Sequence, residues 1–203
     1  MQRENESYDG SQKVAVITGS SKGIGKAIAI EFAKEGYKIV LNARDEDELI
    51  EAVNDVKKTI GATEERVTCS VGNISQESIC ISLIEYTTKV FGSIDVLVNN
   101  ASIGGTSKSG QELTSDKCDY VVDVNLKGAF LCIREAIKKM TNGDKSTIKM
   151  YSIINISSVH ESIPQPQSVP YPASKGGVEM LTKTVALEWQ IKASGTVGLL
   201  RGQ

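Results

Sequence analysis

Residues 14–25 read Val14-Ala-Val-Ile-Thr-Gly-Ser-Ser-Lys-Gly-Ile-Gly25, and this stretch decides the fold of the chain. Its first four residues are apolar and predict a short buried strand, and the apolar residues after the turn recur at helical spacing. Between the two, Gly19 lets the chain turn, Gly23 lets the backbone approach a bound anion, and Gly25 lets the helix pack against the strand. The free amides at the start of that helix then face the anion. This order of elements favours a phosphate site over an empty glycine-rich turn.

The rest of the chain repeats the alternation of apolar strands and amphipathic helices. Strands are predicted at residues 14–17, 38–41, 66–69, 94–98 and 153–156. Helices are predicted at residues 24–34, 46–59, 76–91, 125–140 and 175–190. Such alternation is typical of a parallel sheet with helices on both faces. The sequence therefore predicts an α/β fold of the Rossmann type, with a doubly wound parallel sheet in three layers.

Length and composition narrow the class of protein. The 203 residues suit one domain, and 40% hydrophobic with 24% charged residues is a globular, soluble composition. A net charge of −2 gives no electrostatic reason to expect nucleic acid or an anionic membrane as partner. One histidine and four cysteines without a C-x-x-C pair predict no metal site, and isolated cysteines suit a reducing cytosol. The polar start and the lack of a long apolar run predict neither a signal peptide nor a spanning helix, so a cytoplasmic protein is expected.

The end of the second predicted strand carries a basic residue where a dinucleotide site usually has an acid. That acid binds the ribose 2′-hydroxyl of NAD, whereas a 2′-phosphate needs a cation. Ala43 stands at the place of the acid and Arg44 follows it, with a guanidinium that can bind phosphate at two points. Lys22 in the glycine-rich turn adds a second positive charge, while Asp45 supports the opposite choice because it can accept from a hydroxyl. Together these residues favour NADP over NAD as cofactor.

Tyr171 and Lys175 lie four residues apart, which places them on one face of a helix. A free phenol ionises at about pH 10 and is a poor base at neutral pH, and a lysine ammonium beside it favours the phenolate. The spacing alone is weak, since chance supplies such pairs. The polar residues at 99–102, Asn125 and 157–158 strengthen it, because strand ends of a parallel sheet converge at one edge. Taken singly, each is a cap or turn residue, but together they predict a shared pocket.

These residues as a set resemble the short-chain dehydrogenase/reductase family. The pattern T-G-x-x-x-G-x-G is present at Thr18–Gly25, and N-N-A is present at Asn99–Ala101. Ser158 precedes Tyr171 by thirteen residues, and Lys175 follows four residues later. The expected fold of this family is the Rossmann type that the periodicity predicts independently.

Within that family, the segments 156–161 and 171–177 most resemble the glucose 1-dehydrogenase branch. The resemblance implies an oxidoreductase that transfers a hydride between a nicotinamide cofactor and a secondary alcohol or carbonyl, with a sugar such as glucose as a candidate substrate. The alternative is a non-catalytic NADP-binding remnant of such an enzyme. The resemblance makes 12–189 a dinucleotide-binding domain that also holds the catalytic residues, after a polar extension at 1–11.

The resemblance also implies a role for each residue that matches the family pattern. Tyr171 would be the general acid/base, and Lys175 would favour its ionised form and hold the nicotinamide ribose. Ser158 would hydrogen-bond the substrate oxygen, and Asn125 would hold a water in the proton relay. The residues that would contact the cofactor are Gly19, Ser21, Lys22, Gly23, Ile24, Gly25, Arg44, Asn73, Ile74, Asn99, Ala101, Tyr171 and Lys175.

The chain departs from the family pattern in three places. Ser102 replaces the usual glycine after N-N-A, and residues 144–151 form an apparent short insertion. Residues 190–203 match none of the strand, loop and lid segments that usually follow the last helix. The sheet is therefore expected to lack the last one or two strands of the family. The usual oligomer interface belongs to the same missing part, so a homo-oligomer stays an open expectation.

All four prolines fall within nine residues, and Pro170 and Pro172 flank Tyr171. Proline fixes its own φ and restricts the residue before it. We expect a loop at 159–174 in which the two prolines narrow the backbone choices of the tyrosine and so reduce the entropy cost of holding it. The alternative is that the prolines stiffen the loop for stability alone.

Overall fold

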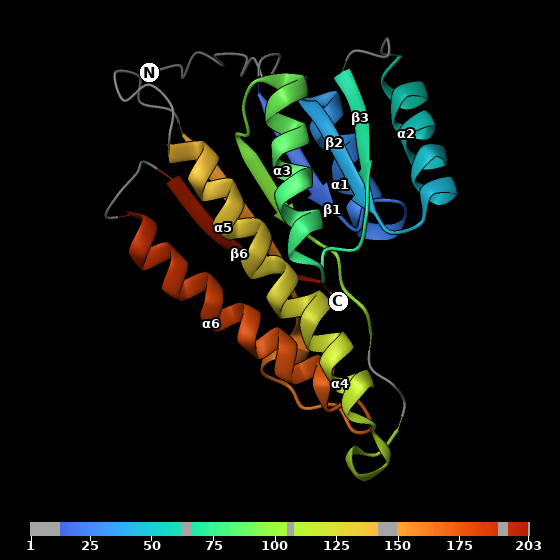
Figure 1. The fold of residues 1–203 in the computed structure, drawn as a ribbon, viewed down its shortest axis with the longest axis vertical. Coiled ribbons are helices and arrows are strands. Elements are labelled where there is room, and N and C mark those ends of the chain that lie inside the picture. Colours follow the sequence, from blue (N-terminus) through green and yellow to red (C-terminus); the bar gives the residue numbers. More distant parts are fainter. Residues whose placement is uncertain (1–12, 62–65, 105–107, 142–149, 191–194, 203) are drawn as a thin grey trace, which may run out of the picture.

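The described residues of the computed structural model form one sheet of six parallel strands between two layers of helices (Figure 1). The structure describes residues 13–61, 66–104, 108–141, 150–190 and 195–202. The strands are β1 (Val14–Thr18), β2 (Lys38–Ala43), β3 (Val67–Val71), β4 (Val96–Asn99), β5 (Tyr151–Ser158) and β6 (Gly195–Gly202). Their order across the sheet is β3-β2-β1-β4-β5-β6, which reverses direction between β1 and β4. The predicted doubly wound parallel sheet is confirmed.

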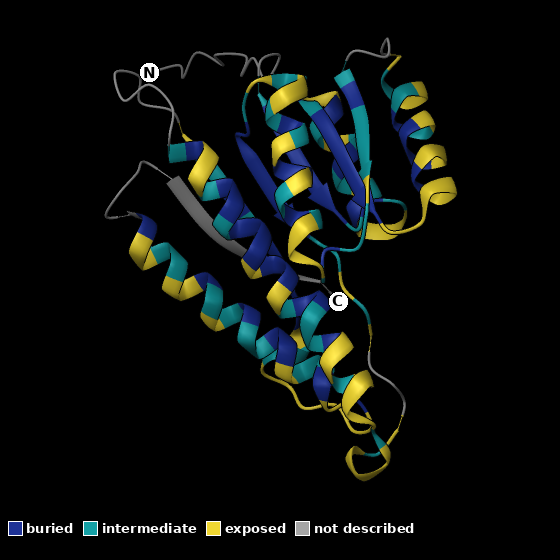
Figure 2. Ribbon diagram, viewed as in Figure 1, coloured by how far each residue is buried: buried dark blue, intermediate teal, exposed yellow. Residues whose placement is uncertain are grey.

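Helices cover both faces of this sheet. They are α1 (Gly23–Lys34), α2 (Glu46–Ile60), α3 (Glu77–Phe91), α4 (Ser115–Val122), α5 (Gly128–Thr141) and α6 (Pro170–Gln190). Successive residues of β1 point to opposite faces, so Ile17 packs in the core with α1 and α2 and Val16 in the core with α3, α5 and α6. Figure 2 shows the central strands β1, β2 and β4 buried and helices that expose their outer sides. Within the described residues, no helix is both long and apolar enough to cross a membrane.

The chain between β4 and α5 contains a helix that the sequence did not predict. α4 is followed by a π-helical turn at Asp123–Lys127, in which the Gly128 amide donates to the carbonyl of Asp123 five residues back. The helix predicted at 125–140 therefore opens with this wider turn, and regular helix begins at Gly128. Glycine fits there because a Cβ would lie 2.7 Å from Ile74 Cδ1. Such turns often occur at functional sites, and this one carries Asn125.

α6 begins at Pro170, five residues before its predicted start, and it includes Tyr171. The expectation of a loop at 159–174 is therefore wrong for residues 170–174, although a 3₁₀ turn at Val159–Glu161 does follow β5. Proline suits the first turn of a helix, because the amide that it lacks has no helical partner there and its fixed φ matches the helix. The backbone of Tyr171 is thus set by the helix that Pro170 starts.

The sixth strand comes from residues that the sequence analysis assigned to no element. β6 pairs with β5 in parallel, from Gly195 opposite Tyr151 to Gly202 opposite Ser158. The sheet consequently has one strand more than the five that periodicity predicted. The polar extension at 1–11 and most of the apparent insertion lie outside the described residues.

A buried carboxylate aligns three neighbouring strands at the edge opposite the glycine-rich turn. Asp95 Oδ2 accepts from the Val14 amide at 2.9 Å and from Ser93 Oγ at 3.1 Å. The Asp95 amide donates to the Val14 carbonyl at 2.9 Å, and its carbonyl accepts from the Ser152 amide at 2.9 Å. Asp95 therefore connects β1, β4 and β5 at the ends that lie away from the glycine-rich turn.

Replacing Asp95 by alanine is expected to lower the free energy of unfolding by about 1–3 kcal/mol, because the fully buried Val14 amide would lose its acceptor. Chemical denaturation of the folded chain measures this change. Asp95→Asn keeps an oxygen in the same place and should lose less. Equal losses in the two variants would show that the charge of Asp95, and not its hydrogen bonds, carries the effect.

Candidate active site

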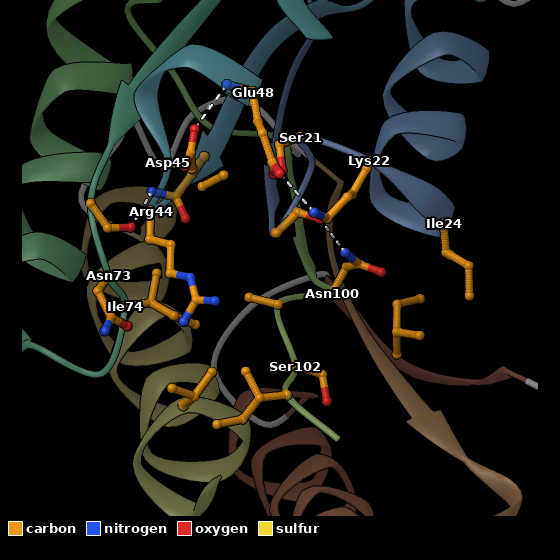
Figure 3. Close-up of a pocket in the computed structure, with 18 of the residues that line it drawn as sticks. Ser21, Lys22, Ile24, Arg44, Asp45, Glu48, Asn73, Ile74, Asn100 and Ser102 are labelled. Carbon is orange, nitrogen blue, oxygen red and sulfur yellow. Dashed lines mark hydrogen bonds and ion pairs between the residues drawn. The ribbon is translucent and has the colours of Figure 1, made fainter. Parts of the chain in front are cut away.

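A cavity of about 470 Å³ opens along the carboxyl ends of the central strands (Figure 3). This volume lies within the range of ligand pockets, and the place is the reversal of strand order where open α/β sheets bind ligands. Most of the sequence-predicted site residues line it, namely Gly19, Ser21, Lys22, Ile24, Arg44, Asn73, Ile74, Ala101, Ser158, Tyr171 and Lys175. Four predicted residues do not belong to the wall, namely Gly23, Gly25, Asn99 and Asn125.

The glycine-rich turn packs tightly against the end of β4 at Gly19. At Gly23, where α1 starts, the space beside the backbone is open. Gly19 has a φ of +62°, and a Cβ there would lie 2.6 Å from Ala101 Cα, so only glycine fits against the end of β4. Gly23 has a φ of +59°, and among the described residues no heavy atom from beyond its chain neighbours and its own helical turn lies within 4 Å of the place of its Cβ. The backbone at Gly23 is therefore bare, as the close approach of an anion to a helix start requires.

Thr18 joins this turn to the end of β4. Its Oγ1 accepts from the amides of Asn100 and Ala101, both at 3.1 Å. Asn100 Nδ2 donates back to the Thr18 carbonyl at 3.0 Å. Asn99 bonds elsewhere, because its Nδ2 donates to Asn155 Oδ1 on β5 at 2.8 Å. Asn100 and Ala101 thus form the cavity wall, and Asn99 braces β4 against β5 behind it.

Two basic side chains, those of Lys22 and Arg44, line one end of the cavity, which we call the basic end (Figure 3). Arg44 Nη1 donates to Tyr120 OH at 2.7 Å, and Lys22 Nζ lies 2.8 Å from Glu48 Oε1. Asp45 accepts from the Glu48 amide at 3.0 Å and so caps α2. Tyr120 belongs to α4, so a helix that the sequence did not predict holds the arginine.

Tyr171, Lys175 and Ser158 line the other end. Lys175 is 3% exposed, and its Nζ donates to the Ile156 carbonyl at 2.8 Å and lies 5.8 Å from the centre of the Tyr171 ring. Ser158 is also buried, and its Oγ accepts from the His160 amide at 3.2 Å. The structure therefore brings a phenol, an ammonium and a hydroxyl to one wall, as the strand ends predicted.

Asn125 lies behind this wall and connects the elements that form it. Its Oδ1 accepts from the Ile103 amide at 2.8 Å, and its Nδ2 donates to the Ile103 carbonyl and to Ser174 Oγ, both at 3.0 Å. Ser174 Oγ donates in turn to the Tyr171 carbonyl at 2.7 Å. Asn125 thus links the loop after β4 to the first turn of α6.

The chain is similar to known proteins over most of its length. The sequence profile of the family described as short chain dehydrogenase matches residues 13–195. The chain belongs to the short-chain dehydrogenase family. The resemblance seen in its motifs is confirmed.

Curated relatives of this short-chain dehydrogenase are named for oxidoreductase activities. Glucose 1-dehydrogenase 2 of Bacillus subtilis (strain 168) is 38% identical over 180 residues, which cover 89% of this chain and 67% of the relative. The 3beta-hydroxysteroid dehydrogenase 1 of Eggerthella lenta is 38% identical over 180 residues, covering 87% of this chain and 65% of the relative. A short chain dehydrogenase/reductase from Burkholderia phymatum, solved in complex with NAD, has a TM-score of 0.85 at 27% identity and covers 95% of this chain and 66% of its own. The chain spans about two thirds of the length of these relatives.

The cavity of this short-chain dehydrogenase fits a nicotinamide dinucleotide. Gly19, Ser21 and Ile24, at the glycine-rich turn and the start of α1, line the cavity and suit a pyrophosphate, and the basic end suits a further anion. Ser157 lines the cavity, and its buried Oγ has no hydrogen-bond partner among the residues that the structure describes. Because a buried hydroxyl without a partner costs free energy, this atom points to a ligand group that completes the site.

Sequence reasoning missed residues of the wall, and one behind it, whose role depends on distant contacts. Tyr120 lies on a helix of eight residues that carries no clear apolar period, so it gave no signal. Ser174 contacts Asn125 across 49 residues of sequence. Glu48 belongs to the charged first turn of α2, and its position three residues after the capping Asp45 was the one available hint.

Burial lowers the pKa of Lys175 from 10.5 to about 8, and the Glu161 carboxylate opposes part of this change. Between pH 8 and 10.5 the unfolded chain binds more protons at this lysine than the folded chain, so its contribution to the free energy of unfolding rises with pH. Below about pH 8 the ammonium is charged in both states, and burying it costs about 3 kcal/mol.

Lys175→Met is expected to raise the free energy of unfolding at pH 7. Removing the buried charge gains up to about 3 kcal/mol, and losing the hydrogen bond to Ile156 costs about 1 kcal/mol of that gain. The gain should shrink as the pH rises from about 8 to 10.5, because the wild-type lysine then loses its charge. Chemical denaturation at both ends of this range measures the difference. Lys183→Met, on an exposed pair of the same helix, is the control and should change little. A gain that does not vary with pH would contradict a buried ammonium.

Proposed function

We propose that this chain is an NADP-preferring oxidoreductase, which transfers a hydride between a nicotinamide cofactor and a secondary alcohol or carbonyl. The observation that carries the proposal is the common wall of Tyr171, Lys175 and Ser158 in a cavity whose other end holds Arg44. The names of its relatives as dehydrogenases support the same chemistry. A sugar such as glucose is the first candidate substrate, because the Bacillus subtilis relative is named for it.

The dinucleotide would extend through the cavity from its basic end to Tyr171. We propose that the turn at 19–25 and the start of α1 hold the pyrophosphate, that Asn73 and Ile74 contact the adenine, and that Arg44 binds the 2′-phosphate. When bound, the nicotinamide supplies or accepts the hydride. Lys175 uses one of its three donors on Ile156 and keeps two for ribose hydroxyls.

Tyr171 would move the proton that accompanies the hydride. In oxidation its oxygen takes the proton of the substrate hydroxyl as general base, and in reduction it returns that proton. The Lys175 ammonium lies 5.8 Å from the ring centre, and its positive charge would stabilise negative charge that develops on the tyrosine oxygen during proton transfer. Ser158 Oγ accepts from the His160 amide, so its own hydrogen is free to donate to the substrate oxygen.

Asn125 would act through the backbone that it holds. Both hydrogens of its side-chain amide are used, on the Ile103 carbonyl and on Ser174 Oγ. We propose Asn125 as a positioning residue for the first turn of α6, which carries Tyr171. The water that the family resemblance assigns to Asn125 stays a prediction.

A non-catalytic NADP-binding protein is the alternative function. The chain aligns with about two thirds of its relatives, so the aligned part need not include everything that they use for turnover. This alternative would keep the basic end and make no use of the phenol. Four free thiols, those of Cys69, Cys80, Cys118 and Cys132, support a cytoplasmic location under either function.

Tyr171→Phe is expected to lower turnover by about 10²-fold or more, because proton transfer loses its acid and base. Its affinity for NADPH should stay close to that of the wild type. Turnover of NADPH with carbonyl substrates, and of NADP with glucose, measures the change. Tyr86→Phe removes a phenol that bonds Thr68 away from the cavity, and it should keep wild-type turnover. Full activity of Tyr171→Phe would exclude the mechanism. A wild-type chain that binds NADPH tightly but shows no turnover would favour the non-catalytic NADP-binding protein.

Arg44→Gln is expected to weaken NADPH binding by about tenfold or more and to leave NADH binding nearly unchanged. The reason is that the guanidinium contacts a group that NADH lacks. Calorimetric titration with each nucleotide gives both affinities. Lys58→Gln, an exposed change of equal charge on α2, is the matched control. Equal weakening of both nucleotides would mean that Arg44 does not read the 2′-phosphate.

A further inference from the structure

The basic end of the cavity carries two cations whose partners differ. Arg44 donates to the phenol oxygen of Tyr120, and it makes no ion pair within the described part of the chain. Lys22 is paired, since its Nζ lies 2.8 Å from Glu48 Oε1. Figure 3 shows Lys22, Glu48 and Ser21 together on one side of the cavity and Arg44 apart from them. The two positive charges are therefore not equally available to an anion.

Glu48 is held in place to make this pair. Its amide donates to the Asp45 carboxylate at 3.0 Å, which fixes it in the first turn of α2. Its two carboxylate oxygens both reach the glycine-rich turn, one to Lys22 and the other to Ser21 Oγ at 3.2 Å. The bond from Lys22 lowers the pKa of Glu48, so the carboxylate is ionised at neutral pH. Glu48, Lys22 and Ser21 all line the cavity.

We propose that Glu48 sets how strongly the site distinguishes a 2′-phosphate from a 2′-hydroxyl on the adenosine ribose, by holding Lys22 in an ion pair. This inference rests on the proposed NADP site. A 2′-phosphate can use Lys22 only if the lysine leaves Glu48, whereas a hydroxyl does not need the lysine. Arg44 favours the phosphate form of the cofactor, and Glu48 limits that preference.

A purely structural role for the pair makes a different prediction. The side chains of Lys22 and Glu48 are 77% and 45% exposed, and ion pairs so open to solvent add little stability. If the pair only joined α2 to the glycine-rich turn, breaking it would change both ligand forms alike or change neither. A selective gain for the phosphate form is specific to the proposal.

The test compares two small ligands that differ by one phosphate, adenosine 2′,5′-bisphosphate and adenosine 5′-monophosphate. Calorimetric titration of Glu48→Gln should show about a two- to fivefold gain in affinity for the bisphosphate and no change for the monophosphate. Glu51→Gln makes the same charge change at an exposed position of α2 outside the cavity wall, and it should change neither affinity. Thermal melting of each variant confirms that it is folded.

A second variant tests whether the effect passes through Lys22. When Lys22→Gln is already present, adding Glu48→Gln should raise the affinity for the bisphosphate no more than adding Glu51→Gln does. A gain that persists without Lys22, or a gain equal to that of Glu51→Gln, overturns the proposal.

The proposed NADP preference fails separately. It fails if the wild type binds the monophosphate as tightly as the bisphosphate. The role of Glu48 is judged instead from the change in bisphosphate affinity between the wild type and Glu48→Gln. A wild-type chain that binds neither ligand overturns both.

Discussion

The hydroxyl of Thr18 holds together the two strand ends between which the site opens. β1 and β4 are neighbours in the sheet although more than 70 residues separate them in the chain, and Thr18 Oγ1 accepts from both the Asn100 and the Ala101 amides. This contact brings Ala101 so close that position 19 must be glycine. It also divides the cavity, because β2 with Arg44 lies on one side of the junction and β5 with Ser158 on the other. Two chemically different ends result from one reversal of strand order.

The buried lysine at the Tyr171 end of the cavity lowers stability, and the helix that carries it is anchored further along its length. The ammonium of Lys175 is buried, which costs about 3 kcal/mol at neutral pH. The same helix packs Val178 and, near its other end, Trp189 into the core, where each contributes about 1.5–3 kcal/mol by leaving water. α6 can therefore hold an unfavourable charge in its second turn because its later turns pack against the sheet. Function and stability are served by different parts of one helix.

Local patterns predicted what local interactions decide. Apolar runs located the first five strands to within a few residues, and motif spacing placed Tyr171, Lys175 and Ser158 on one wall. β6 was not predicted because glycines at 195, 198 and 202 weaken its strand pattern. The start of α6 escaped because Pro170 was interpreted as a loop residue, although proline at the first helical position is equally regular. The π-helical turn escaped because apolar periodicity does not show one wider turn within a helix.

Contacts between distant residues explain the rest of what the sequence did not show. Counting charges gives the basic end two cations, and only the fold shows that one is paired and one is held by a phenol. The type of side chain then matters. A guanidinium that spends one donor on Tyr120 keeps four in a planar fork, so Arg44 stays able to bind phosphate at two points. The ammonium of Lys22 is a point charge, and one carboxylate offsets it. We therefore expect the two cations to contribute unequally to anion binding, and we propose that the choice of cofactor depends on which cation keeps its charge available.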